Sequence, residues 1–462
     1  MTDTIIHDAT IVTGDDRGTI HYDAALVVAD DRIAAIGATS ELLARYPIAE
    51  RVNGRGRAVM PGFANTHTHL AMTIARGIYE DLSPPHRPPF TGGLAELPLP
   101  PLETSERTIM AELGVLEAIR SGTTLLLEDG AGVSGHAPSL LRSGVRCVLT
   151  ERAWDRANAS IGQPGPFQVS EKLAEDGLAR IRQSHADWNG KGAGRIQVGV
   201  SAWAPDMCSP AMLRRVRALQ DELGATATIH LNQIWGEVAA VKEQRGVLPT
   251  EYLAREGFLS DRLIAAHCRC MTADEERLLG ASRAAVAFNA AIAARRGLSP
   301  RVAELEAAGA LIAMGSDNMA EDMVEVMRTG LFMERVRRQD GRHPTPEDVL
   351  AWGTRNGYRA LGVADGGWLA PGNKADFIVV DLRKPHLAPA LRVVSDFVHQ
   401  GQPADIEFVM VDGHWLMRDG RVLTLDESVI VQEAGLVARA AWRRMFETRS
   451  DLTPPPGFDP RP

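Results

Sequence analysis

Five side chains that bind metal ions well occur at four points in the middle of the sequence. His67 and His69 stand two residues apart in N-T-H-T-H-L. Three more follow singly, namely His230 in T-I-H-L, His267 in A-A-H-C and Asp317 in G-S-D-N. Because residues i and i+2 of an extended chain point to the same side, His67 and His69 can reach one ion. Imidazole and carboxylate together form a good ligand shell for Zn²⁺ or Fe²⁺.

Three histidines and one aspartate around a metal leave a coordination position for water. The metal lowers the pKa of that water, so that hydroxide is available near neutral pH. A nearby carboxylate can accept the proton and return it to a leaving group. Any one of these histidines alone is more often a packed or capping residue. The conjunction of four histidines and an aspartate is what indicates a metal-dependent hydrolase.

The elements that must position these side chains are short apolar runs, each followed by a helical pattern such as residues 211–223. Near-continuous apolar runs are typical of strands buried on both faces of a parallel sheet. Repeated β-then-α units predict a (β/α)₈ barrel, whose active site lies at the carboxyl ends of its strands. The metal-binding residues stand at those ends. The runs are 57–63, 122–128, 145–150, 195–201, 226–231, 262–267, 284–288 and 310–316.

The two ends of the chain have a different texture, with β-type runs joined by Asp/Gly turns. The run V-M-V-D-G-H-W-L-M predicts a hairpin centred on Asp412 and Gly413. We therefore predict a small β-sandwich domain built from residues 1–58 and 365–440. The barrel is predicted to occupy residues 59–364, and residues 441–462 are predicted to be a helix end and a tail.

Composition narrows the function. The chain has 462 residues and a net charge of −9, which argues against a protein that binds nucleic acid by neutralising phosphates. The N-terminus lacks a signal-peptide pattern, and no apolar run is long enough to span a membrane. Four cysteines in such a chain are expected to be reduced thiols, and the expected location is the cytoplasm. They are Cys147, Cys208, Cys268 and Cys270.

The motifs together resemble the amidohydrolase superfamily. Within it, the chain is similar to the branch that holds methylthioadenosine/adenosylhomocysteine deaminases, guanine and cytosine deaminases and triazine hydrolases. The resemblance implies one divalent metal, most commonly zinc with iron as the alternative, on His67, His69, His230 and Asp317. It also implies that His267 orients the hydrolytic water, that Asp317 accepts its proton, and that the chain forms a homo-oligomer. The stretches are P-G-F-A-N-T-H-T-H-L-A-M-T, S-G-T-T, H-L-N-Q-I-W-G-E-V, A-A-H-C, G-S-D-N and L-A-P-G-N-K-A-D-F-I-V-V-D.

One departure from the deaminase pattern affects proton transfer. Three residues after the strand-five histidine those deaminases have a glutamate that shuttles a proton, whereas this chain has Gln233. An amide can hydrogen-bond a ring nitrogen but cannot give and regain a proton at neutral pH. Glu237 matches a second glutamate of the family, and it is either a substrate contact or a carboxylate at a helix start.

Other departures affect the pocket. Trp203 and Phe288 stand where nucleoside deaminases carry polar substrate contacts, and each is either a pocket residue or part of the core. If they line the pocket, they favour a flatter or more apolar substrate than a nucleoside. The usual tryptophan-bearing helix after the first strand is also missing, which argues against methylthioadenosine or adenosylhomocysteine as the substrate. Asn318, next to Asp317, is a further candidate substrate contact.

The favoured function is deamination of an amino-substituted heterocycle. The alternative is hydrolytic displacement of an N-alkyl amine or a halide, or the opening of a cyclic amide. Gln233 favours this alternative, since such leaving groups need less ring protonation. A barrel that has lost activity and only binds a ligand is the least favoured reading, because a complete set of four metal ligands argues for catalysis.

Overall fold

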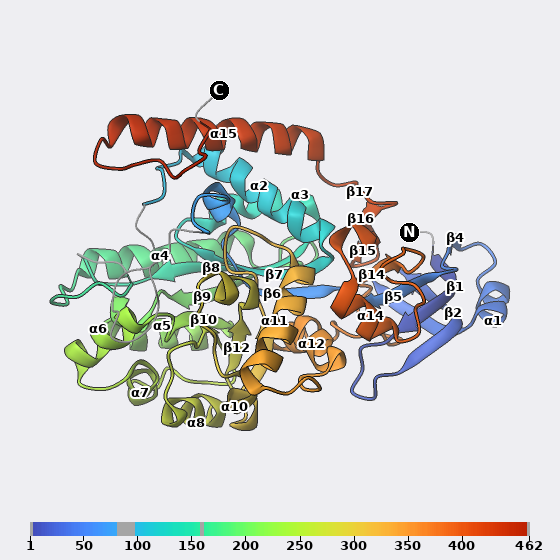
Figure 1. The fold of residues 1–462 in the computed structure, drawn as a ribbon, viewed down its shortest axis with the longest axis horizontal. Coiled ribbons are helices and arrows are strands. Elements are labelled where there is room, and N and C mark those ends of the chain that lie inside the picture. The colour runs from blue at the N-terminus through green and yellow to red at the C-terminus, as the bar shows by residue number, and fades with distance from the viewer. Residues whose placement is uncertain (1–2, 81–97, 158–160, 460–462) are drawn as a thin grey trace.

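The computed structural model describes residues 3–80, 98–157 and 161–459. Its strands form two sheets that lie side by side (Figure 1). One sheet is a barrel from the middle of the chain. The other combines the N-terminal and C-terminal strands, seen in blue and red in Figure 1. Both predicted parts of the fold, the barrel and the composite β part, are therefore present.

The barrel consists of eight parallel strands in chain order, as predicted. It closes where Thr68 pairs with Asp317 in a parallel bridge and where the Thr66 hydroxyl donates to the Met314 carbonyl at 2.9 Å. The strands are β6 (Phe63–Thr68), β7 (Thr123–Gly130), β8 (Arg146–Ala153), β9 (Ile196–Ala202), β10 (Ala227–Leu231), β11 (Leu263–His267), β12 (Ala285–Phe288) and β13 (Leu311–Met314).

The first predicted strand, 57–63, is divided between the two sheets. Its first part, β5 (Arg57–Pro61), pairs with strands of the terminal sheet, and the barrel strand β6 starts only at Phe63. Gly62 separates them, and a Cβ at this position would lie 2.2 Å from the Thr124 side chain. His67 consequently lies within the first barrel strand and not after it. The break could not be recognised in the sequence, because both sheets bury their strands and the residues on either side of Gly62 are therefore apolar.

Helices cover the outside of the barrel (Figure 1). Their ends carry local signals, such as the capping box of Thr272 and Glu275 and the left-handed C-cap Gly224. The helices are α2 (Thr104–Arg120), α3 (Ala137–Ser143), α4 (Glu171–Trp188), α5 (Pro210–Leu223), α6 (Trp235–Arg245), α7 (Pro249–Arg255), α8 (Ala273–Ala281), α9 (Ala290–Arg295), α10 (Val302–Ala307), α11 (Met323–Arg338), α12 (Pro346–Gly353) and α13 (Arg355–Ala360).

The terminal strands form one mixed sheet of nine strands, in the order β17-β16-β15-β14-β5-β1-β2-β3 with β4 beside β1. Apolar clusters pack on it around Ile6 and Phe377 and around Ile5 and Leu42. Besides β5, its strands are β1 (Thr4–Val12), β2 (Ile20–Ala29), β3 (Arg32–Ala38), β4 (Glu50–Asn53), β14 (Phe377–Asp381), β15 (Ile406–Val411), β16 (His414–Arg418) and β17 (Arg421–Val422).

The predicted hairpin joins β15 to β16. Asp412 and Gly413 both have positive φ, 48° and 74°, as a two-residue hairpin turn requires. Only glycine fits at 413, because a Cβ there would lie 1.9 Å from the Asp30 carbonyl oxygen. The remaining helices are α1 (Thr39–Arg45), α14 (Val393–Gln400) and α15 (Glu427–Thr448), and α15 runs across α2 (Figure 1).

A buried ion-pair cluster joins the barrel to the terminal sheet. The Arg146 guanidinium, on β8, donates to both carboxylate oxygens of Asp376, at 3.0 and 3.2 Å, and also to Asp412 in the hairpin turn. Tyr358 donates to Asp376 from α13 at 2.9 Å. This cluster fixes the relative position of the two sheets.

The four cysteines are buried and make no disulfide. Among the described residues, no helix is long and apolar enough to cross a membrane.

Candidate active site

The five predicted metal-binding side chains converge at the carboxyl end of the barrel. The Nε2 atoms of His69 and His230 lie 3.3 Å apart. Asp317 Oδ1 lies 3.8 Å from His67 Nε2 and 3.5 Å from His69 Nε2. All are buried, and the most exposed of them, His69, shows only 8% of its surface. The site is therefore a compact, buried cluster of imidazoles and one carboxylate.

Hydrogen bonds that the histidine rings donate to backbone carbonyls determine which ring nitrogens face the cluster. His69 Nδ1–H donates to the Asp129 carbonyl at 2.7 Å, and His230 Nδ1–H donates to the Trp203 carbonyl at 3.0 Å. Both rings therefore keep a lone pair on Nε2. Orientation of a metal-binding histidine through its other nitrogen is the usual arrangement in proteins.

His67 gives the clearest indication of a missing partner. It is completely buried, and neither of its ring nitrogens has a hydrogen-bond partner among the described residues. A buried polar group without a partner is costly unless something satisfies it. Its neighbours His69, His230 and Asp317 offer nitrogen and oxygen lone pairs at the same place. These residues fit a divalent metal ion, which would satisfy His67 directly.

The electrostatics keep these imidazoles in the metal-binding form. Burial lowers the pKa of His67 and His230 well below the usual value, and nearby histidines and Arg152 lower it further. Burial and Arg269 lower the pKa of His267 in the same way. All three rings are therefore neutral at physiological pH. A neutral imidazole is the form that binds metal.

The backbone holds Asp317 in an uncommon conformation, with φ of 72°. Its N–H donates to the His67 carbonyl at 2.9 Å, and its carbonyl accepts from His69 N–H at 2.8 Å. The Asn318 amide donates to Asp317 Oδ1 at 3.1 Å. Asn318 therefore helps to hold the Asp317 carboxylate in place. The Oδ1 atom of Asn318 is itself buried and has no partner among the described residues.

Glu237 lies under the turn that carries Gln233. Its two carboxylate oxygens accept the N–H groups of Asn232 and Gln233, at 2.8 and 2.7 Å. Burial raises the pKa of Glu237, and Asp206 raises it further. The structure thus engages Glu237 with the backbone of the turn. Gln233 itself is buried, and its Oε1 has no partner among the described residues.

The two aromatic candidates lie in different surroundings. Trp203 is half-buried beside the site: its carbonyl orients His230, and its ring lies 5.2 Å from the Trp154 ring and 5.7 Å from the Arg152 guanidinium. Phe288 is fully buried within the main core, where its ring limits the space at Gly330 of α11. Trp203 is therefore placed near the site, whereas the surroundings of Phe288 favour its alternative reading as a core residue.

Several residues of the site were not singled out from the sequence. Arg152 and Asp129 are paired at 2.7 Å, and an Arg152 nitrogen lies 3.2 to 3.4 Å from ring nitrogens of His69 and His230. Arg269 and Asn289 both contact His267. Asp129 and Arg152 stand near the carboxyl ends of β7 and β8, so the positional rule for barrels could have identified them.

A cavity of about 230 Å³ adjoins the cluster. His69 and the paired Asp129 and Arg152 line one part of it. Another part is lined by His136, whose Nδ1 lies 3.2 Å from Glu128. One of the predicted metal ligands, His69, thus faces a cavity.

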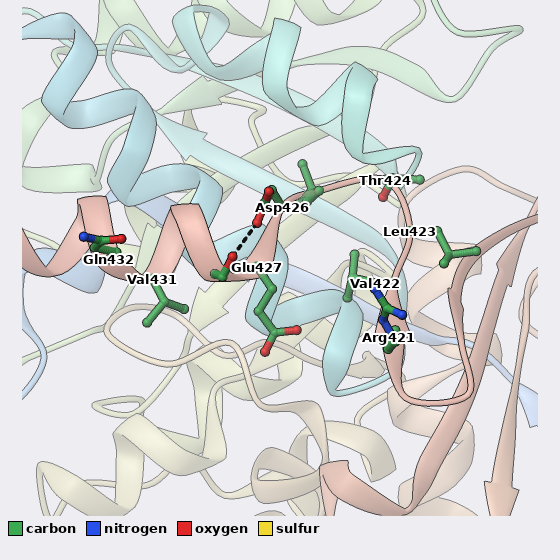
Figure 2. A pocket seen from close by; sticks show the side chains of 10 residues that line it. Arg421, Val422, Leu423, Thr424, Asp426, Glu427, Val431 and Gln432 are labelled. Carbon is green, nitrogen blue, oxygen red and sulfur yellow. Dashed lines mark hydrogen bonds between the residues drawn. The ribbon is translucent and has the colours of Figure 1, made fainter.

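A larger hollow of about 970 Å³ lies elsewhere on the molecule (Figure 2). Its lining comes from residues 421–432, at the junction of β17 and α15. Within this segment the Ser428 hydroxyl donates to Asp426 at 2.8 Å, and Figure 2 marks a hydrogen bond at Asp426 with a dashed line. Since every lining residue lies within this short segment, the hollow is separate from the histidine cluster.

A barrel with a histidine–aspartate cluster at the carboxyl ends of its strands defines a class, the metal-dependent hydrolases built on a (β/α)₈ barrel. The comparisons with known proteins narrow this class. The model of the amidohydrolase family matches residues 58–416, and that of the bacterial imidazolonepropionase-like composite domain matches residues 24–47.

Curated relatives cover nearly the whole chain. A 5-methylthioadenosine/S-adenosylhomocysteine deaminase from Pelotomaculum thermopropionicum is 30% identical, over 94% of this chain and 98% of its own. A 5'-deoxyadenosine deaminase from Methanothermobacter thermautotrophicus is 32% identical, over 84% of this chain and 88% of its own. The chain belongs to the amidohydrolase family, and it is a hydrolase.

Solved structures show the same fold. A zinc-bound adenosine deaminase from Xanthomonas campestris has a TM-score of 0.84 and 24% identity, covering 96% of this chain and 99% of its own. A zinc complex of an atrazine chlorohydrolase from Arthrobacter aurescens has a TM-score of 0.82 and 17% identity, covering 94% of this chain and all of its own.

Proposed function

We propose that this protein deaminates an amino-substituted heterocycle by hydrolysis, with one zinc ion held by His67, His69, His230 and Asp317. The observation that carries the proposal is the buried His67, whose two nitrogens have no partner among the described residues and which lies beside the Nε2 atoms of two other histidines. When bound, a divalent metal makes a water molecule acidic enough to act as a nucleophile.

In the proposed reaction, the water oxygen bonds to the ring carbon and the bond from that carbon to the amino group breaks. Asp317 accepts one proton from the water and returns it to the amino group, which leaves as ammonia. The second proton of the water stays with the product, as its hydroxyl or as a ring N–H. His267 orients the water and the reacting carbon. Backbone hydrogen bonds from Asp317 to His67 and His69 hold the residue in place, and the Asn318 amide holds its carboxylate.

Two residues near the histidine cluster are compatible with a flat substrate. The Trp203 ring offers an apolar surface beside the site, and the Gln233 amide can hydrogen-bond a ring nitrogen or carbonyl. The curated relatives are named for adenine nucleosides, so amino-purines stand first among the substrates to test.

Gln233 favours a second candidate function, the displacement of an N-alkyl amine or a halide. At this position the side chain cannot shuttle a proton to the ring. Leaving groups that need less ring protonation are therefore compatible with this site. The opening of a cyclic amide belongs to the same alternative.

The test is a substrate screen on purified protein of known metal content. Amino-purines, amino-pyrimidines, chloro- and N-alkyl-triazines and cyclic amides are incubated in parallel, and ammonia release and product mass are followed together. Ammonia from an amino-heterocycle supports the first proposal. Loss of amine or halide, or gain of one water without ammonia, supports the second. Light scattering on the same sample tests the proposed homo-oligomer.

A further inference from the structure

His267 is the one site histidine whose ring is held by side chains from its own loop and from the next strand. Its Nδ1 lies 3.0 Å from an Arg269 guanidinium nitrogen and 3.0 Å from the Asn289 amide nitrogen. Its Nε2 is buried and has no partner among the described residues. The rings of His67 and His230 face it at 5.2 and 5.3 Å between centroids.

The Arg269 guanidinium determines which ring nitrogen of His267 carries the proton. Arginine has only N–H donors and no acceptor, so a hydrogen bond from Arg269 requires a lone pair on Nδ1. The neutral ring must then carry its proton on Nε2. The alternative acceptor for a proton on Nδ1 is Asp317, whose Oδ2 lies 3.9 Å away, which is beyond hydrogen-bond distance.

Arg269 also fixes the orientation of the Asn289 amide. An amide can present either its oxygen or its nitrogen, but a lone pair on Nδ1 accepts only from the nitrogen. The Asn289 Oδ1 atom is then buried on the other side, where it has no partner among the described residues. The contacts of Arg269 and of the Asn289 amide nitrogen with Nδ1 thus favour the same tautomer of the ring.

We propose that Arg269 and Asn289 are positioning residues that hold His267 in its Nε2–H tautomer, so that this histidine donates a hydrogen bond in the reaction and does not accept a proton. This inference refines the role of His267 within the proposed function. It leaves Asp317 as the side chain that accepts the proton of the water.

The tautomer can be measured without any substrate. Full-length protein labelled with ¹⁵N-histidine is studied by long-range ¹H–¹⁵N correlation, which distinguishes a protonated ring nitrogen from one with a lone pair. His267→Gln assigns the signal. The expected result for the wild-type protein is a proton on Nε2 and none on Nδ1. A proton on Nδ1, or on both nitrogens, would overturn the proposal.

Variants of Arg269 and Asn289 test whether these two residues set the tautomer of His267. Arg269→Lys keeps a donor without an acceptor and is expected to preserve the Nε2–H tautomer. The double variant Arg269→Met with Asn289→Asp replaces both donors and offers a carboxylate acceptor, so it is expected to move the proton to Nδ1. A double variant that folds, judged by circular dichroism, and keeps the proton on Nε2 would contradict the proposal. The wild-type spectrum decides the tautomer even where a variant fails to fold.

Activity provides a separate readout that rests on the proposed function. Loss of partners that orient active-site histidines typically costs about 10- to 100-fold. Arg269→Met is expected to lower kcat by about this factor with little change in KM, and Arg269→Lys to recover part of the loss. Failure of the proposed function would leave the tautomer result intact, whereas an unaltered kcat in a variant with a shifted tautomer would refute the catalytic role of the arrangement.

Discussion

The backbone of Asp317 is hydrogen-bonded on both sides to the strand that carries His67. Asp317 N–H donates to the His67 carbonyl at 2.9 Å, and the Asp317 carbonyl accepts from His69 N–H at 2.8 Å. The two ends of the barrel sheet are thus joined at the residues predicted to bind the metal. The hydrogen bonds that close the barrel are therefore made by the same residues that form the candidate metal site. The predictions on ligand removal and on stabilisation by metal follow from this arrangement.

Removal of a predicted ligand is expected to abolish metal binding. For His67→Ala we expect the metal content to fall from one ion per chain to well below one. Because loss of an orienting partner alone costs 10- to 100-fold, loss of a ligand should lower kcat/KM by at least about 100-fold. Elemental analysis and steady-state kinetics measure both. His21→Ala, which changes an exposed histidine of β2, is the matched control and should behave as the wild type.

Metal is also expected to stabilise the folded chain, since it binds the assembled cluster and not the unfolded chain. At free metal about 1,000 times the Kd, the gain is about 4 kcal/mol. Treatment with a chelator should lower the melting temperature, and re-addition of zinc should restore it. A melting temperature that is the same with and without metal would contradict the assignment of this cluster as the metal site.

Gln233→Glu tests whether proton delivery limits deamination. A positioned acid or base contributes about 10²- to 10⁴-fold, so a carboxylate at this position should raise kcat for an ammonia-releasing substrate by at least about tenfold. Gln183→Glu makes the same charge change on the exposed face of α4 and is expected to leave kcat unaltered. If the enzyme displaces halides or alkyl amines instead, Gln233→Glu should bring no gain in kcat.

Arg146→Met should destabilise the junction of the two sheets. Removing one member of a buried ion pair typically costs about 3–5 kcal/mol, because the charge that remains, here Asp376, stays buried without its partner. Asp412 also loses Arg146 but keeps Lys374, at 3.4 Å. Denaturant unfolding measures the change. Lys172→Ala removes an exposed pair with Asp176 and should cost less than about 1 kcal/mol. Equal effects of the two substitutions would show that the buried cluster is not a structural anchor.

Asp322 should make stability depend on pH. It caps α11, and burial raises its pKa from 3.8 to about 6. Because the folded state holds this proton more tightly, its contribution to stability is present below pH 3.8 and is lost as pH rises through 6.

Asp322→Asn keeps the cap but cannot ionise. We expect the variant to gain about 1–2 kcal/mol relative to the wild type between pH 5 and pH 8, given 1.36 kcal/mol per pKa unit. Denaturant unfolding at both pH values measures this difference. A constant difference between the two proteins across this range would contradict the expectation.

Local patterns in the sequence were sufficient to predict the barrel, the composite terminal sheet and the candidate metal-binding side chains. These features rest on local patterns: apolar runs predict strands, and strands of a parallel barrel present the residues at their carboxyl ends to one common site. The Asp412–Gly413 turn was predictable for the same reason, since its two positive φ values are a local demand.

The neighbours of each residue, in contrast, became known only from the folded chain. The run 57–63 is continuous in sequence, but Gly62 divides it between two sheets because Thr124 leaves no room for a side chain there. Trp203 lies beside the site while Phe288 lies in the core, although both end or follow apolar strands. The direction of a side chain at a strand end depends on local twist and on contacts from distant segments, and neither is encoded in the spacing.

The tautomer proposed for His267 is a second feature that the spacing of residues in the sequence does not reveal. It depends on Arg269, two residues away, and on Asn289, which follows a different strand. The residue types were visible in the sequence, but the hydrogen bonds that connect them exist only where β11 and β12 lie side by side. The sequence therefore supplies the chemical groups, and the fold assigns each group its partner, because hydrogen bonds act over distances that only the packed chain brings about.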